Sequence, residues 1–136
     1  MSAEQNIQIA KNCYAAFGRG DVPAILAALD DSVEWVTPEV DLPTGGVRHG
    51  KPEVAQFFQA VSDAWEFQGF EARDYVASGD RVAVCGSYKM TGKVSGRTAA
   101  CDWAMVWTFR DGKVVRFQEY TDTSALKDAY MARAAA

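Results

Sequence analysis

The apolar residues change their spacing about halfway along the chain, and this change limits the folds that the sequence can adopt. Before about residue 67 they recur every three or four positions, which is typical of amphipathic helices. From residue 67 onwards, stretches of apolar and polar alternation are separated by turn residues, as in antiparallel strands. Helices that come early and strands that come late predict an α+β fold.

Caps and turns place the individual elements. The sequence predicts two helices before residue 30, a short strand over 33–36, an irregular stretch over 37–50, a third helix over 54–65, strands over 67–77, 82–91, 97–109 and 114–121, and a last helix from 124. Loops as long as residues 37–50 are often functional. We expect a single domain over residues 1–136, in which a curved antiparallel sheet and three helices enclose one small-molecule pocket.

Composition narrows the possible partners of this 136-residue chain. The formal net charge is −4 and the basic residues are scattered, so we expect no nucleic-acid partner. The three cysteines have no paired spacing, and neither a metal-ligand cluster nor a phosphate-binding loop is present, so no metal or cofactor is expected. The chain shows no signal peptide and no apolar run of about 20 residues, which predicts a cytoplasmic protein without a membrane span.

Motifs along the whole chain together resemble the SnoaL-like branch of the NTF2-like, or ketosteroid-isomerase-like, superfamily. They are Tyr14-Ala-Ala-Phe17 with Gly20-Asp21, Leu29 to Trp35, Gly50, Val106 to Val115, and Glu119 to Thr123. The resemblance implies a cone of helices on a curved sheet, a homodimer joined through the outer sheet face, and a pocket. It does not define the reaction, because this scaffold hosts isomerases, cyclases, hydrolases and non-catalytic binding proteins.

Ketosteroid isomerases use a tyrosine and two cavity carboxylates. Those positions fall on Cys13, near Val36 and near Met105, so the resemblance does not extend to that catalytic set. Limonene-type epoxide hydrolases carry an aspartate after the last long strand, which Asp122 matches. Their arginine and second aspartate have no counterpart, since the corresponding region offers only Lys89.

We therefore predict Asp122 as the acid/base, with Tyr120 beside it. Glu119 lies on the opposite strand face from these two residues, so a regular strand cannot point all three inward. The alternative role for Asp122 is an N-cap of the last helix. The lone histidine, His49, is either a surface residue or an acid/base.

Period-2 alternation divides residues 97–109 into two faces. The bulky face, which includes Trp103, Met105 and Trp107, suits a cavity wall or an ordinary core. The small face, with Ala104, Val106 and Thr108, suits contact with a second subunit. The predicted ligand-contact residues are Tyr14, Phe17, Trp35, Phe57, Phe58, Tyr88, Trp103, Trp107 and Gln118.

Two functions fit these features. The first is an acid/base isomerase, cyclase or hydrolase that acts on a small apolar or amphipathic cyclic molecule. The alternative is a non-catalytic, dimeric ligand-binding module. Two or more polar side chains that converge in the pocket favour the enzyme, whereas a wholly apolar or filled pocket favours the binding module.

The protein is expected to be a homodimer in solution. Ala104, Val106 and Thr108 are too small and apolar to leave a sheet face uncovered, and such a face favours association. Light scattering at micromolar concentration should therefore give the mass of two chains, and the mass of one chain would contradict the prediction.

Overall fold

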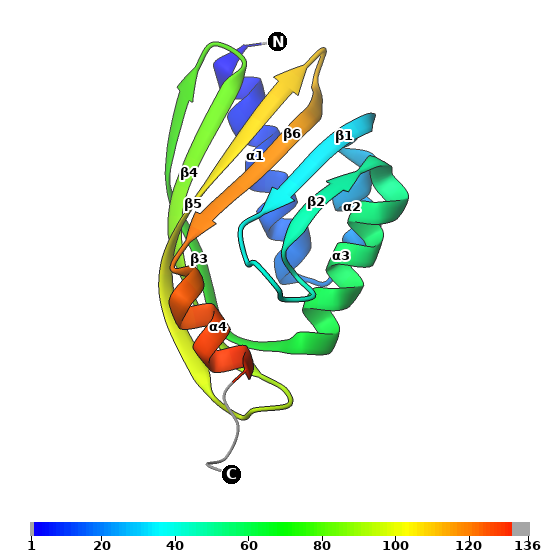
Figure 1. Ribbon diagram of the computed structural model, residues 1–136. Helices are drawn as coiled ribbons and strands as arrows, with labels where there is room; N and C mark the ends of the chain where they lie inside the picture. Colours follow the sequence, from blue (N-terminus) through cyan, green and yellow to red (C-terminus); the bar gives the residue numbers. More distant parts are fainter. Residues whose placement is uncertain (1, 132–136) are drawn as a thin grey trace.

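The computed structural model describes residues 2–131 and has the α+β architecture that the sequence predicts (Figure 1). The elements are α1 (Ala3–Gly18), α2 (Val22–Ala27), β1 (Leu29–Thr37), β2 (Gly46–His49), α3 (Gly50–Ala64), β3 (Trp65–Ser78), β4 (Arg81–Gly92), β5 (Thr98–Arg110), β6 (Lys113–Thr121) and α4 (Thr123–Met131). Within residues 2–131, no helix is both long and apolar enough to cross a membrane.

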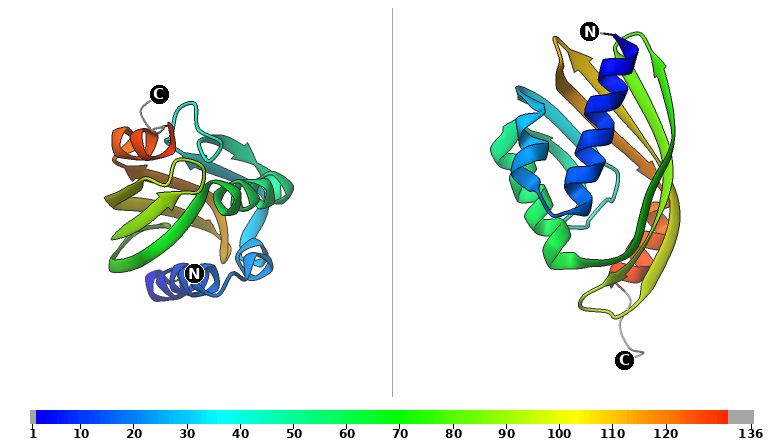
Figure 2. Two further views of the ribbon diagram at one scale, coloured as in Figure 1. Left: turned by 90° about the horizontal axis from the view of Figure 1, so that it is seen from below. Right: turned by 180° about the vertical axis from the view of Figure 1, so that it is seen from behind.

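The strands form one sheet in the order β2-β1-β6-β5-β4-β3. Strands β3 to β6 are an antiparallel meander, as expected from their short turns, and β1 joins β6 in parallel. The register of β3 shifts twice against β4, after Phe67 and after Ala72, and such bulges bend a strand. The sheet therefore curls, with α1, α2 and α3 across its concave side and α4 at one end (Figures 1 and 2).

Local sequence explains where the first two helices begin. The Ser2 hydroxyl accepts the backbone N–H of Gln5, while the Gln5 side chain accepts the N–H of Ser2, so the predicted capping box is formed. The Asp21 carboxylate accepts the N–H of Ala24 and caps α2. These contacts satisfy backbone donors that the helices themselves leave unpaired.

The structure departs from the sequence prediction around the irregular stretch. Residues Gly46–His49 form the edge strand β2, which pairs with β1 and aligns Arg48 with Trp35. This strand has four residues and no apolar alternation, so its pairing depends on β1 and could not be predicted from its own sequence. Helix α3 starts at Gly50, earlier than predicted, and Trp65 is the first residue of β3 instead of the last of the helix.

The predicted alternation along β5 is confirmed. Cys101, Trp103, Met105, Trp107 and Phe109 are all buried, whereas Ala104, Val106 and Thr108 lie half-buried on the outer face. Gly86 on β4 faces the Trp103 indole so closely that a Cβ there would lie 2.5 Å from the indole Cζ2 atom. A glycine at this position therefore makes room for the tryptophan.

Replacement of Gly86 by alanine should destabilise the protein by about 1–3 kcal/mol, because the added methyl group overlaps Trp103 and the Glu71 carbonyl. Urea denaturation measures the change. Gly69→Ala on the neighbouring strand is the matched control, since nothing lies within 4 Å of the Cβ position there. Equal stabilities of the two variants would contradict the packing argument.

Candidate active site

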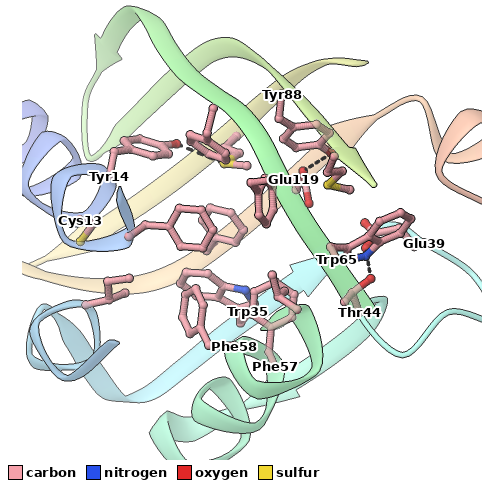
Figure 3. A pocket seen from close by; sticks show the side chains of 18 of the residues that line it. Cys13, Tyr14, Trp35, Glu39, Thr44, Phe57, Phe58, Trp65, Tyr88 and Glu119 are labelled. Carbon is pink, nitrogen blue, oxygen red and sulfur yellow. Dashed lines mark hydrogen bonds between the residues drawn. The ribbon is translucent and has the colours of Figure 1, made fainter. Parts of the chain in front are cut away.

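A cavity with about 80 Å³ of free space lies between the concave sheet face and helices α1 and α3 (Figure 3). This space holds several water molecules or one small ring, since a water molecule needs about 10–15 Å³ on this scale. Aromatic side chains make up most of the wall: Tyr14, Phe17, Trp35, Phe57, Phe58, Trp65, Phe67, Phe70, Tyr88, Trp107 and Phe117. An apolar wall with a few polar groups is typical of small-molecule sites.

Most of the predicted ligand-contact residues lie in this wall. The structure brings together Tyr14, Phe17, Trp35, Phe57, Phe58, Tyr88 and Trp107. Trp103 faces the same way and is 4% exposed, but it does not line the cavity; its ring stacks on Tyr14, with 5.7 Å between centroids. Gln118 lies between the buried Phe117 and Glu119 on β6 and therefore belongs to the outer face.

Tyr120 and Asp122 do not face the cavity, so the prediction that they do is wrong. Tyr120 is on the outer face of β6 and is 52% exposed. The chain turns into α4 after Thr121, and the exposed Asp122 carboxylate accepts the Ala125 N–H at 3.0 Å. This bond is the N-cap that the sequence offered as the alternative role for Asp122. His49 is also exposed and lies outside the cavity, at the start of α3.

Glu119 is the first of two acids that the structure places in the cavity wall. It lies on the inward face of β6 and is 6% exposed. The Tyr88 hydroxyl, from β4, donates to Glu119 Oε2 at 2.7 Å and also lies 3.0 Å from Thr121 Oγ1. Glu119 could have been predicted from the sequence, because it lies two residues after the apolar Phe117 and therefore on the same strand face. The similarity of Asp122 to the epoxide hydrolase aspartate favoured the opposite face instead.

Glu39 is the second acid and comes from the loop between β1 and β2. It is 5% exposed, and its Oε2 atom accepts the Thr44 hydroxyl at 2.8 Å. The loop folds back tightly: a Cβ on Gly45 would lie 1.6 Å from the Glu39 carbonyl oxygen, so only glycine fits there. The Arg48 guanidinium holds the loop by donating to the carbonyls of Pro43 and Gly45.

The two acids differ in their electrostatic surroundings. Burial disfavours the charge on Glu119, and the nearby Glu39 adds repulsion; together they raise the pKa of Glu119 to about 8, although the Tyr88 hydrogen bond offsets part of the rise. Burial also raises the pKa of Glu39, but the Thr44 hydroxyl and the charge of Arg48 favour its ionised form. Glu39 therefore ionises first, and the pair retains a proton near neutral pH.

The remaining polar groups of the wall are neutral, and among them the buried Trp35 indole N–H has no acceptor within residues 2–131. The Tyr14 hydroxyl accepts the Trp107 indole N–H at 2.9 Å and donates to Met105 Sδ at 3.2 Å. Burial raises the pKa of the Cys13 thiol to about 11, so it stays protonated. Residues 2–131 bring together no group of three or more histidine, cysteine or acidic side chains that could hold a metal ion. The chemistry of this wall is therefore that of two carboxyl groups.

Residues 10–117 match the SnoaL-like domain family, and the chain belongs to that family. An NTF2-like protein of unknown function from Burkholderia pseudomallei has 32% identity, with 97% of this chain and 100% of that chain covered and a TM-score of 0.88. An NTF2-like protein from Burkholderia xenovorans has 37% identity, with 96% and 98% covered and a TM-score of 0.87. TerC, co-crystallized with polyporic acid, has 32% identity, with 94% and 99% covered and a TM-score of 0.82. No curated protein matches the chain.

The raised pKa of Glu119 should make the stability of the protein depend on pH. The carboxyl binds its proton more tightly in the folded protein, with a pKa of about 8 against 4.5 for an ordinary glutamate. Its contribution to the free energy of unfolding is therefore complete at low pH. This contribution is lost as the pH rises from about 4.5 to about 8, at up to about 1.4 kcal/mol per pH unit. Urea unfolding of Glu119→Gln should show less loss over the same range than unfolding of the wild type.

Asp122→Asn is the matched control for this measurement, because it also removes one acid but at an exposed position where asparagine caps the helix equally well. The control should keep the pH slope of the wild type. Identical slopes for Glu119→Gln and the wild type would show that Glu119 titrates normally.

Proposed function

We propose that this protein is an acid/base catalyst that moves a proton on a small, partly apolar ring compound. The observation that carries the proposal is the pair of buried carboxyl groups, Glu39 and Glu119, in the wall of one aromatic cavity. Two titratable groups whose surroundings separate their pKa values can act as base and acid at the same pH. Convergence of these acids with Tyr88 favours an enzyme over a purely apolar binding site.

Each member of the pair has a role in the proposed reaction. Glu39, the acid that ionises first, accepts a proton from a carbon next to a carbonyl group of the substrate. Glu119, which keeps its proton, donates to the carbonyl oxygen, and the product of this step is the enol. Glu39 then returns the proton to carbon, and the enol hydroxyl gives its proton back to Glu119, which restores both side chains. Return to the same carbon gives hydrogen exchange, whereas return to a different carbon of a conjugated enol completes an isomerisation.

The surroundings of the pair support this assignment. The aromatic wall excludes water, which strengthens the effect of each charge on a bound ring. Tyr88 bonds to Glu119, so it is a positioning residue that orients the acid. The co-crystallization of TerC with polyporic acid supports a small organic molecule as the ligand of this fold.

Deuterium exchange tests the proposal with a defined probe, the single-ring ketone cyclohexanone, whose α-hydrogens exchange through its enol or enolate. In D2O near pH 7, the wild-type protein should speed deuterium incorporation, as measured by proton NMR. Glu39→Gln and Glu119→Gln should each lower the protein-catalysed rate about 100-fold or more, because general acid or base catalysis is lost.

The surface variant Asp122→Asn should retain the wild-type rate. Equal rates in the wild type and both glutamine variants would contradict the proposal. Saturable binding of cyclohexanone without accelerated exchange would instead support the non-catalytic, ligand-binding alternative.

A further inference from the structure

The cavity wall carries acids without compensating cations. Glu39 and Glu119 line it, and no lysine, arginine or histidine does so among the described residues. Its other polar atoms belong to neutral side chains such as Tyr88 and Thr44. An anion that enters this cavity would lose its hydration and meet the negative charge of the pair, so both effects oppose its binding.

Arg48 is the cation that acts on Glu39, but it does not line the cavity, and its hydrogen bonds go to carbonyl groups of the loop. Its Nη1 atom donates to the Gly45 carbonyl at 3.1 Å, and its Nη2 atom donates to the Pro43 carbonyl at 2.8 Å. The guanidinium carbon also lies 5.0 Å from the centroid of the Phe57 ring. Through these contacts, Arg48 stabilises the loop. A ligand carboxylate in the cavity is therefore left without a cationic partner.

One oxygen of Glu39 lacks a hydrogen-bond partner. The Oε2 atom is bonded to Thr44, whereas the Oε1 atom is buried and has no partner among residues 2–131. Figure 3 shows Glu39 and Thr44 together in the wall, near Trp65. A buried acceptor without a donor is costly, and a ligand that brings one donor to this oxygen removes that cost.

We propose that the cavity selects uncharged ring compounds that carry a hydroxyl group, which donates to Glu39 Oε1, and that it rejects carboxylates. The ring occupies the aromatic space while the hydroxyl satisfies the open oxygen. A hydroxyl suits this site better than an ammonium group, because an ammonium brings three donors and a full charge into a wall with one open acceptor. This inference rests on the proposed function and names the substrate class of the same site, a ring that carries a hydroxyl besides its carbonyl. The hydroxyl uses one lone pair of Glu39 Oε1, and the second lone pair stays free for the proton that the base accepts.

Four single-ring probes separate charge from hydrogen bonding: phenol, fluorobenzene of similar shape without a donor, benzoate, and benzylammonium. Their dissociation constants can be measured at pH 7 by NMR, from the indole N–H signals of Trp35 and Trp107 in the cavity wall. Phenol should bind about tenfold or more tightly than fluorobenzene, as expected for a hydrogen bond to a charged acceptor. Benzoate should bind at least tenfold more weakly than phenol.

Two variants of Glu39 separate its charge from its open oxygen. Glu39→Gln removes the charge and leaves one oxygen, which Thr44 already engages, so benzoate should gain affinity. Glu39→Leu removes the acceptor, so phenol and fluorobenzene should bind equally. Asp122→Asn is the surface control and should leave all four affinities unchanged.

Three outcomes would overturn the inference: benzoate that binds the wild type as tightly as phenol, benzylammonium that binds more tightly than phenol, or no saturable binding of phenol. Failure of the proposed function is distinguishable, because it is measured by deuterium exchange. The expected order of affinities without catalysed exchange would leave the selectivity intact and remove the catalytic role.

Discussion

The stack of Trp35 on Phe117 joins the two parts of the chain that form the candidate site. Their ring centroids are 3.9 Å apart, and the residues are partners in the parallel pairing of β1 with β6. Glu39 lies in the β1–β2 loop, just after the end of β1 at Thr37. Glu119 follows Phe117 on the same face of β6. This pairing therefore brings two acids that are distant in the sequence into one wall.

The aromatic packing that shapes the cavity also determines its electrostatics. Rings from α1, α3 and the sheet exclude water from the carboxyl groups, and exclusion of water raises their pKa values. The loop around Arg48 adds an asymmetry, since it favours the charge on Glu39 alone. The proposed acid/base function and the proposed selection of uncharged ligands thus rest on the same burial, although they are measured by different experiments.

Sequence patterns predicted the fold far better than the site. Alternation along β5 correctly indicated which residues face inward, and helical spacing correctly brought Phe57 and Phe58 into the wall. Glu119 was missed because similarity to one catalytic motif favoured Asp122, and Glu39 was missed because it lies in a loop without helical or strand periodicity. The sequence showed that Glu119 and Asp122 lie on opposite faces of the strand. Alternation alone, however, does not say which of the two faces is buried at the end of a strand.

The sequence by itself determined the order of the elements, the capped starts of α1 and α2, and the aromatic character of the interior. These features depend on local spacing and on contacts between neighbouring residues. Only the tertiary structure decided that Glu39 lies in the cavity, that β2 forms, and that Asp122 caps a helix outside it. The first two outcomes depend on the pairing of β1 with β2 and β6, and no local pattern encodes such long-range contacts. The third follows from the end of β6 at Thr121, after which Asp122 forms its local bond to Ala125 and does not face the cavity.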